Sequence, residues 1–300
     1  MSMPPEVVVI QRNPRSGTGR GRAELLKLYR ELTNLGYQVR MFSRRRVLDR
    51  FVASIGSGRT LRCLVAAGGD GTVTDLTNRH PGLAIAILPL GTENLLAAYL
   101  GIRRDGRQLA QLIHQGFVRT LDSAIANGQR FLLMLSVGVD AEIVAAIDAA
   151  RTGHISKFSY LWPTLRAFLA GRNQVYQATD ESGHSITGTH LIVTNVPRYG
   201  FNLKFAPEAS PADGLLHVRA YHGSSGPQLW WHALRLKLGL RIHPQEISVL
   251  TATHVVVTAV AAADQSCVSQ ADGDPGPRFP VSISIAPGTV RLICNAITQK

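Results

Sequence analysis

The stretch from Leu61 to Thr72 reads LRCLVAAGGDGT, and it decides the fold. Residues Leu61–Ala67 are mostly apolar and predict a buried β-strand. The glycines and the aspartate that follow predict a tight turn, and Val73–Asn78 predicts a helix. A strand that passes through a glycine turn into a helix is the start of a βαβ unit, so this stretch predicts a parallel sheet.

The same order recurs on both sides of this stretch. Val7–Ile10 predicts a strand that ends at the polar segment NPRSG, which begins at Asn13. Tyr37–Phe42 predicts another strand, and Leu83–Leu88 predicts a strand that ends in PLGTEN, residues 89–94. We therefore expect polar loops at the carboxyl edge of a parallel sheet, which is where open α/β sheets bind their ligands.

Beyond about residue 122 the pattern changes. Short strand-like runs separated by turn clusters predict a second domain of antiparallel, sandwich-like β structure. These runs are Arg130–Ser136, His190–Asn195, Leu215–Tyr221, His254–Val260 and Val281–Ile285. We expect a two-domain α/β protein: an N-terminal nucleotide-binding domain of residues 1–122, to which residues 288–300 return, and a β-rich substrate domain of residues 123–287, with the active site in the cleft between them.

The composition is that of a globular protein. The 300 residues are 45% hydrophobic and 17% charged, which excludes a disordered chain and a coiled coil. No apolar run reaches the roughly 18 residues of a membrane-spanning helix, and the N-terminal segment does not resemble a signal peptide. The three cysteines have no CxxC spacing and predict neither a disulfide framework nor a zinc site. We expect a cytoplasmic protein with peripheral membrane contact.

The net charge of +12 is concentrated in the first part of the chain. Residues 1–120 carry 18 basic and 8 acidic side chains, so ten of the twelve net charges lie in the part that contains the three polar loops. Most of the basic residues are arginines, whose planar guanidinium suits phosphate oxygens. An anionic ligand or surface is therefore expected. Nucleic acid is not, because no recognisable nucleic-acid-binding module accompanies the charge.

The GGDGT turn has the chemistry of a phosphate site. Gly68, Gly69 and Gly71 have no Cβ, so backbone N–H groups can close on phosphate oxygens, and the following helix N-terminus adds positive potential. The carboxylate of Asp70 would repel phosphate, so it indicates a bridging Mg²⁺ or a hydrogen-bonding role. The alternative interpretation is a tight turn in which Asp70 is the helix N-cap.

NPRSG, GGDGT and PLGTEN, in this order and at these spacings, resemble the catalytic domain of the diacylglycerol kinase and sphingosine kinase superfamily, in particular its compact bacterial lipid kinases. The resemblance continues in Ser210–Leu216 and Ala271–Pro275 and covers nearly the whole chain. It implies an enzyme that transfers the γ-phosphate of ATP to a hydroxyl of a lipid, diacylglycerol-like or sphingoid, with ATP and Mg²⁺ as cofactors. The implied partners are ATP and a lipid substrate at a membrane surface, and a homodimer is left open.

The resemblance also assigns residues. The family's ATP-contacting positions fall on Asn13, Ser43, Gly68, Gly69, Asp70, Gly71, Thr72 and Thr92. Its structural Mg²⁺ site falls on Ser210, Asp213 and Leu215, two of them through main-chain carbonyls. Its proton-accepting carboxylate follows an Asp-Gly pair, which makes it Asp274, with Asp272 as the competing base and Asp70 as a further catalytic carboxylate. An ordinary hairpin turn is the alternative interpretation of Asp272–Pro277.

Two carboxylates are one methylene shorter than in many relatives. Asp75 stands where they have Glu after the GGDGT turn, and Asp274 likewise replaces the usual Glu. This shortening supports a second hypothesis, a nucleotide-binding regulatory protein of the same fold with weakened chemistry. A third is an NAD kinase, which shares the GGDGT turn, although PLGTEN and the segment ASPADGLL favour the lipid branch.

Two stretches interleave aromatic and basic residues. Ile155–Leu169 and Leu229–Leu240 each predict an amphipathic helix. Such a helix either lies on an anionic lipid surface or packs in the core with its basic side chains toward water. The run Arg44-Arg45-Arg46 is interpreted as a solvated face, with attraction to a membrane surface as the second interpretation.

Overall fold

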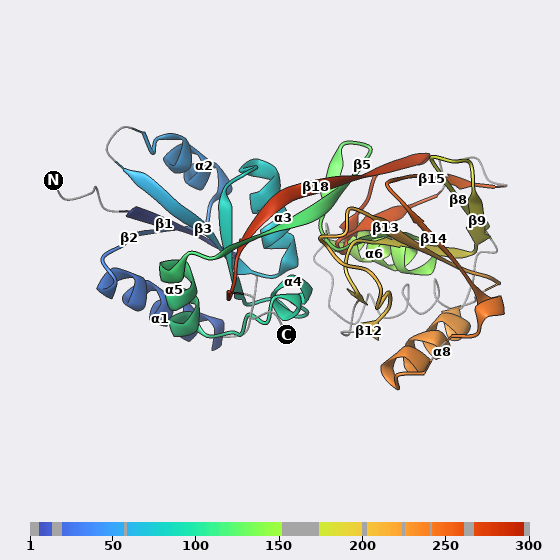
Figure 1. The fold of residues 1–300 in the computed structure, drawn as a ribbon, viewed down its shortest axis with the longest axis horizontal. Coiled ribbons are helices and arrows are strands. Elements are labelled where there is room, and N and C mark those ends of the chain that lie inside the picture. Colours follow the sequence, from blue (N-terminus) through green and yellow to red (C-terminus); the bar gives the residue numbers. More distant parts are fainter. Residues whose placement is uncertain are drawn as a thin grey trace. The chain divides into compact units, whose positions relative to one another are not determined.

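A computed structural model describes residues 6–13, 20–56, 59–151, 174–199, 203–223, 226–240, 242–260 and 267–296. The chain divides into two compact units, the first of residues 1–121 with 288–300 and the second of residues 122–287. Two strands, β5 (Val118–Ala126) and β18 (Val281–Ile293), run from one unit into the other (Figure 1).

The first unit is built on a parallel sheet. Its strands are β1 (Glu6–Arg12), β2 (Gln38–Phe42), β3 (Thr60–Gly68), β4 (Ala84–Pro89) and the end of β18. Their order is β2-β1-β3-β4-β18, and neighbouring strands pair in parallel. The central strands β1 and β3 are buried along most of their length, as parallel strands with both faces covered are.

Helices follow the strands, as the βαβ pattern requires. They are α1 (Arg20–Asn34), α2 (Arg45–Ala53), α3 (Asp70–Arg79), α4 (Leu95–Tyr99) and α5 (Gly106–Gln115). Helix α3 begins at Asp70, so most of the GGDGT motif is already helix. The pattern did not predict helix α5. Its N-cap is Asp105, whose carboxylate accepts the N–H groups of Arg107 and Gln108.

The second unit contains two sheets that share one apolar core. One sheet holds β5, β6 (Gln129–Phe131), β8 (Tyr176–Asp180), β9 (Ser185–Gly188), β15 (His254–Ala259) and most of β18. The other has the order β14 (Ile247–Ala252), β13 (Leu216–Tyr221), β10 (His190–Thr194), β7 (Met134–Val137), β16 (Ser269–Ala271) and β17 (Asp274–Pro275), and its strands pair antiparallel.

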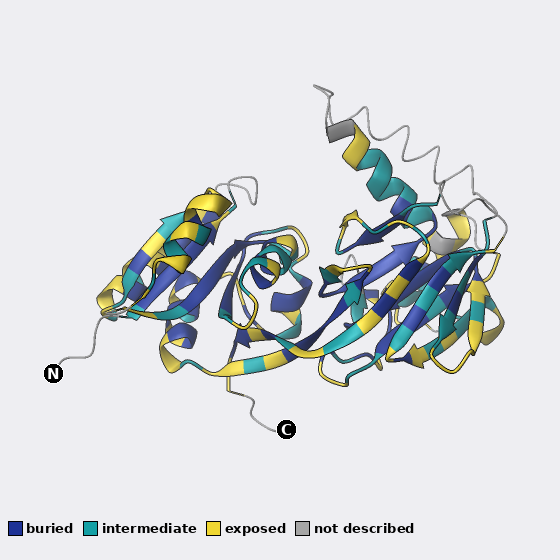
Figure 2. Cartoon of the chain, turned by 90° about the horizontal axis from the view of Figure 1, so that it is seen from above, coloured by how far each residue is buried: buried dark blue, intermediate teal, exposed yellow. Residues whose placement is uncertain are grey.

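Buried side chains from both sheets fill the space between them. Ala178 and Val257 of the first sheet belong to the same core cluster as Val193 and Val218 of the second. In Figure 2, buried residues alternate with partly exposed ones along many of the strands. An α/β first part and an antiparallel, sandwich-like second part confirm the predicted fold class.

Outside the sheets the second unit has α6 (Val139–Arg151), α8 (Gly226–Lys237), the 3-10 helix η3 (Pro244–Glu246) and a ribbon of β11 (Arg198–Tyr199) and β12 (Leu203–Lys204). The helix predicted over Leu229–Leu240 is α8, which begins three residues earlier. The helix predicted over Ile155–Leu169 lies outside the described residues. Within the ranges that the structure describes, no helix is both long and apolar enough to cross a bilayer.

Candidate functional site

The carboxyl ends of the first strands meet at one edge of the parallel sheet. The amide of Asn13 donates to the carbonyl of Ala67 at 3.2 Å, and the amide of Leu90 donates to the carbonyl of Gly68 at 2.9 Å. These bonds join the residues that follow β1 and β4 to the last two residues of β3.

Ser43 belongs to the same edge, because β2 ends at Phe42, which pairs with Gln11 of β1. Ser43 and Thr92 are exposed, whereas Thr72 is buried. Parallel pairing therefore places the starts of the three predicted loops and Ser43 at one edge of the sheet. Residues 14–17 of the NPRSG segment lie outside the described residues.

The two glycine loops touch through their backbones. A Cβ added to Gly91 would lie 2.5 Å from the Cα of Gly69, and a Cβ on Gly68 would lie 2.2 Å from the Oγ1 of Thr72. Close packing therefore explains Gly68 and Gly91. Gly71 is different, because it is exposed and a Cβ there would meet no atom within 4 Å. Packing within the fold does not require a glycine at position 71. A ligand that approaches the backbone here would require one.

Asp70 joins the two loops. Its carboxylate accepts the backbone N–H of Leu95 at 2.8 Å and of Leu96 at 3.1 Å, at the start of α4. Asn94, the N-cap of α4, provides no side-chain cap, because its amide group bonds to the backbone of Gly91. Asp70 therefore caps α4. The alternative of Asp70 as the N-cap of its own helix is wrong, because Asp70 is the first residue of α3 and its N-cap is Gly69.

Burial raises the pKa of Asp70, and the charge of Glu93 adds to this, while the N–H groups of Leu95 and Leu96 act in the opposite direction. A half-buried carboxylate with a raised pKa at the carboxyl edge of a parallel sheet is typical of functional sites. Asp70 also has a structural role, because both of its carboxylate oxygens accept backbone N–H groups at the start of α4.

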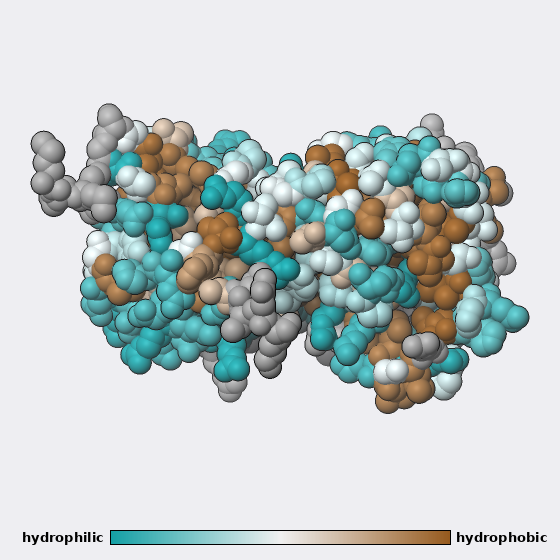
Figure 3. All heavy atoms as spheres, in the orientation of Figure 1, coloured by the Kyte–Doolittle hydropathy of each residue, from teal (hydrophilic) through white to brown (hydrophobic). Residues whose placement is uncertain are grey.

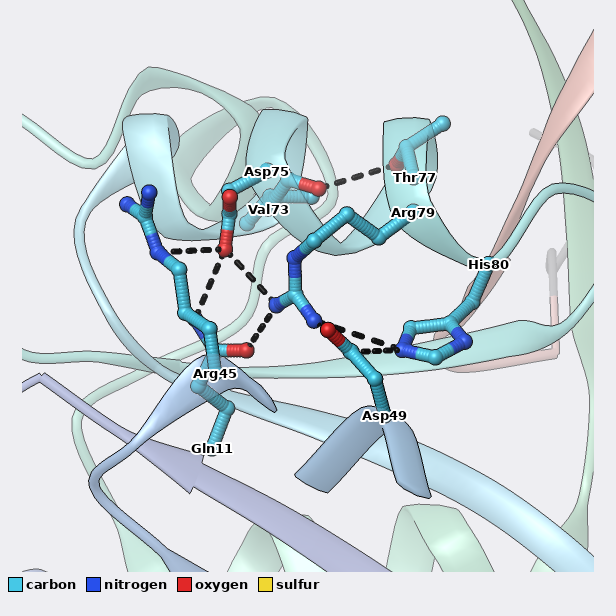
Figure 4. Close-up of polar contacts among 8 residues, drawn as sticks. All are labelled: Gln11, Arg45, Asp49, Val73, Asp75, Thr77, Arg79 and His80. Atoms are coloured by element: carbon cyan, nitrogen blue, oxygen red, sulfur yellow. Dashed lines mark hydrogen bonds and ion pairs between the residues drawn. The ribbon is translucent and has the colours of Figure 1, made fainter. Parts of the chain in front are cut away.

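A charged network braces the end of β1 against α3 (Figure 4). The Oδ2 of Asp75 accepts from Gln11 Nε2 at 2.9 Å and from Arg79 Nη2 at 2.8 Å, and lies 3.3 Å from Arg45 Nε. Arg79 also donates to Asp49 and to the Oε1 of Gln11. The interpretation of Arg45 as merely solvated is therefore incomplete, although its side chain stays largely exposed.

Two opposing effects set the charge of Asp75. Burial raises its pKa, but the hydrogen bonds from Arg79 and Gln11, with the charges of Arg79 and Arg45, outweigh burial and lower it. Sequence reasoning singled out Asp75 only as a shortened acid. The i, i+4 spacing from Asp75 to Arg79 was the one local signal of this network.

The second predicted group lies on the hairpin of β16 and β17. Ala271 pairs with Asp274, and the two residues between them, Asp272 and Gly273, have φ values of 51° and 85°. Positive φ at both positions is the type I′ pattern that Asp-Gly favours. The hairpin-turn interpretation of Asp272–Pro277 is confirmed for the backbone of this turn.

The two aspartates of the hairpin have different surroundings. The Oδ2 of Asp272 accepts the N–H of Leu132 at 2.8 Å, and its Oδ1 accepts the N–H of Leu133 at 2.9 Å and of Met134 at 3.1 Å. Asp272 therefore holds the bend between β6 and β7, which is why the predicted single strand over Arg130–Ser136 is two strands. Asp274 is exposed.

The three predicted metal ligands lie in one turn. Asp213 accepts the N–H of Ser210 at 3.0 Å and of Leu215 at 2.9 Å, and its Oδ2 lies 2.9 Å from Nε2 of the buried His217. Among the described residues, no group of three or more His, Cys, Asp or Glu side chains is arranged to hold a metal ion. One carboxylate with main-chain carbonyls is nevertheless an oxygen-only donor set, which suits a hard cation such as Mg²⁺.

The second unit also has a partly open cavity of about 520 Å³, a size typical of small-molecule sites. Residues of α6, β10, β12, β13 and α8 contribute to its lining. The apolar ones are Val139, Ile143, Ile192, Leu203, Phe205, Trp230, Ala233, Leu234 and Leu236, and the others are Asp140, His190, Tyr221, His232 and Lys237.

Three polar atoms at this cavity lack hydrogen-bond partners. They are Nδ1 of His190, Oη of Tyr221 and Nδ1 of His232, all buried and unsatisfied within the described part of the chain. Because buried polar atoms are normally paired, these atoms indicate a ligand that carries polar groups. Sequence reasoning missed the cavity, since its lining comes from segments far apart in the chain and no local pattern marks it.

Asp140 supplies the acidic group of the cavity. Ser136 Oγ donates to its Oδ2, and Nδ1 of His190 lies 3.6 Å from its Oδ1. Gln270 donates to Ser136 Oγ through Nε2 and accepts the N–H of Gly273 at 2.9 Å through Oε1. Hydrogen bonds thus connect the acidic wall of the cavity to the hairpin turn between β16 and β17.

Two family descriptions match the chain. The first, "Diacylglycerol kinase catalytic domain", matches residues 6–126. The second, "YegS C-terminal NAD kinase beta sandwich-like domain", matches residues 134–294, which is more than half of the chain. Together they confirm the resemblance on which the assignment of residues depends.

Individual relatives named as kinases are similar to this chain at modest sequence identity. The "Diacylglycerol kinase" of Bacillus subtilis strain 168 is 24% identical over 256 residues, which cover 82% of this chain and 83% of that protein. The "Probable lipid kinase YegS-like" of Klebsiella pneumoniae strain 342 is 30% identical over 167 residues, which cover 53% of this chain and 56% of that protein. The "Uncharacterized protein sll0036" of Synechocystis is 26% identical over 161 residues, and the chain spans only 37% of its length.

The fold is also found in solved structures. The crystal structure of a diacylglycerol kinase from Bacillus anthracis strain Sterne matches with a TM-score of 0.68 over 98% of both chains, at 18% sequence identity. At this identity the likeness shows a shared fold.

Proposed function

The chain belongs to the diacylglycerol kinase family with a YegS-type C-terminal domain, and from this premise we propose that it is an ATP-dependent lipid kinase. The reaction transfers the γ-phosphate of ATP to a hydroxyl of a diacylglycerol-like or sphingoid lipid. The observation that carries the proposal is the apolar cavity with its unsatisfied buried polar atoms, in a chain that also has a phosphate-type sheet edge.

We assign ATP to the carboxyl edge of the first sheet. Backbone N–H groups at the N-terminus of α3 are suited to phosphate oxygens, and Gly71 leaves space for them. Asn13, Ser43 and Thr92 lie on the surrounding loops. Mg²⁺, when bound with ATP, neutralises phosphate charge during the transfer. The positive net charge of residues 1–120 supports the capture of an anionic nucleotide.

Between the two aspartates of the hairpin, we assign the proton-accepting role to Asp274. Both oxygens of Asp272 already accept N–H groups, whereas Asp274 is exposed. In the transfer, the acceptor oxygen forms a bond to the γ-phosphorus, the bond to the leaving oxygen of ADP breaks, and the hydroxyl proton passes to the carboxylate. The shorter side chain of Asp274 can serve if the acceptor lies close to the hairpin.

The cavity of the second unit is our proposed lipid site. Its apolar lining suits an acyl or alkyl chain, because burial of such a chain is favourable at about 25 cal/mol per Å². The unsatisfied Tyr221 Oη and the acidic group of Asp140 would then hold the polar part of the lipid. Burial raises the pKa of Tyr221, so the phenol remains a donor at neutral pH.

The test is transfer of labelled γ-phosphate from ATP to diacylglycerol, a sphingoid base and NAD, each offered separately with Mg²⁺. We expect label in a lipid product, a loss of at least about 100-fold in kcat for Asp274→Asn, and no loss for Asp148→Asn, which removes an exposed carboxylate of α6. Labelled NADP without labelled lipid would favour an NAD kinase. ATP binding without transfer to any acceptor would favour the regulatory hypothesis.

A further inference from the structure

Helix α8 and its C-terminal turn expose a patch of large apolar side chains. Of the twelve large hydrophobic residues that are exposed in the described part of the chain, five lie within residues 230–240, so the patch is not a scatter of single residues. They are Trp230, Trp231, Leu234, Leu238 and Leu240. Hydrophobic spheres gather at the place of α8 in Figure 3.

The patch has the geometry of an interfacial helix. At about 100° per residue, Trp230, Leu234 and Leu238 fall on one stripe, with Trp231 at its edge. Arg235 and Lys237 fall on either side of this stripe. The two tryptophans are 66% and 57% exposed, an unusual state for the largest apolar side chain in water.

The opposite face of α8 belongs to the protein. His232 is buried there, and its Nε2 lies 3.6 Å from Oε1 of Glu246. The helix ends in a turn at Gly239, where the N–H of Leu240 donates to the carbonyl of Arg235 at 2.8 Å. The helix is therefore anchored on one side, and its apolar stripe faces away from that anchor.

Charge identifies the kind of surface that covers the stripe. The sequence from residue 226 to 243 contains three basic residues and no acidic one. Basic side chains that flank tryptophans and leucines match the anionic headgroups and the acyl boundary of a bilayer, where tryptophan is enriched. A protein partner would need an apolar groove surrounded by acidic side chains to match this stripe. An anionic membrane offers negative charge and an apolar interior without any such specific arrangement, so we favour the membrane.

The same helix forms a wall of the cavity. Trp230, Leu234 and Lys237 line the cavity and also belong to the exposed stripe or its edge. We propose that α8 lies in the interface of an anionic bilayer, so that a lipid chain passes from the bilayer into the cavity beside Trp230. Docking of α8 stands on the stripe and its charges alone, whereas passage of a lipid rests on the proposed function.

Vesicle sedimentation tests the docking. The full-length protein is mixed with vesicles of phosphatidylcholine, with or without phosphatidylglycerol. We expect binding to the anionic vesicles, a loss of roughly tenfold or more for Trp230→Ser with Trp231→Ser, and a loss of about fivefold for Lys237→Gln on anionic vesicles only. The matched control is Leu26→Ser with Tyr29→Ser, which removes two exposed apolar side chains from α1 and should change nothing.

Tryptophan fluorescence gives a second readout that does not depend on a loss of binding. The chain has three tryptophans, so Trp162→Phe leaves only those of α8. Brominated phosphatidylcholine in anionic vesicles should quench their emission. Docking elsewhere on the protein would leave the emission unquenched and would overturn the proposal, as would equal binding by the double serine variant.

A short-chain, water-soluble diacylglycerol separates this inference from the proposed function. Phosphorylation of that substrate without vesicle binding through α8 would overturn the inference alone. Vesicle binding and quenching without phosphorylation of any lipid would overturn the lipid-kinase proposal alone. If both hold, Trp231→Ser with Leu238→Ser, at two exposed positions that do not line the cavity, should reduce turnover of vesicle-borne lipid about as much as it reduces vesicle binding, while turnover of the soluble substrate is retained.

Discussion

Replacing Gly71 by alanine tests whether this glycine is needed for the fold or for binding a ligand. The added methyl would meet no atom within 4 Å, and φ at this position is not positive. Gly71 lies in the first turn of α3, where alanine is the better helix former by up to about 1 kcal/mol. Gly71→Ala should therefore leave the melting temperature unchanged or raise it by roughly 1–4 °C.

Nucleotide binding should respond in the opposite direction. If phosphate oxygens lie against the N–H groups of this turn, the methyl group displaces them, and we expect the Kd for ATP with Mg²⁺ to rise about tenfold or more, equal to about 1.4 kcal/mol. Calorimetric titration measures the Kd, and differential scanning calorimetry measures the melting temperature. Gly56→Ala is the matched control, since its Cβ also meets open space and it lies outside the glycine loops.

An unchanged Kd in Gly71→Ala would refute the assignment of ATP to this edge. A melting temperature lowered by several degrees would instead show that the added methyl group collides with neighbouring atoms. The two measurements therefore test the ligand and the fold separately.

Further predictions concern the aspartates. Asp70→Ala leaves the first two N–H groups of α4 without their acceptor and should lower the free energy of unfolding by about 2–3 kcal/mol in urea titrations; a loss below about 0.5 kcal/mol would show that the cap is dispensable. Asp272→Ala should cost about 3 kcal/mol and Asp272→Asn less, because asparagine tolerates positive φ. The pKa of Asp75 is lower in the folded protein than in the unfolded chain. Its contribution to the free energy of unfolding is therefore full above the unfolded pKa and is lost as the pH falls through the folded pKa. Asp75→Asn should make the free energy of unfolding less dependent on pH in this acid range. Mg²⁺ should raise the melting temperature of the wild type, and Asp213→Ala should abolish that rise if the ion binds at the Ser210–Leu215 turn.

Local patterns were enough to predict the sheet edge. Runs such as Leu61–Ala67 end in glycine turns, and parallel pairing brings those ends together, so the grouping of Asn13, Gly68 and Thr92 follows from periodicity and topology. The Asp-Gly turn at Asp272 could also be predicted, because its backbone preference is local.

The contacts that distinguish the carboxylates could not be predicted in this way. Asp70 finds its partners at Leu95 and Leu96, and Asp272 finds Leu132 and Leu133 nearly 140 positions away. Nothing in the neighbouring sequence specifies such pairs, since they depend on how strands and helices pack. The cavity was missed for the same reason.

The most direct measurement of the central claim is mass spectrometry of a bacterial total-lipid extract after incubation with the protein, Mg²⁺ and ATP that carries heavy oxygen in its γ-phosphate. We expect one class of hydroxyl-bearing lipid to gain a single heavy phosphate, and Asp274→Asn to reduce this gain greatly. Heavy label found only in free phosphate, or in added NAD and in no lipid, would contradict the assignment of this protein as a lipid kinase.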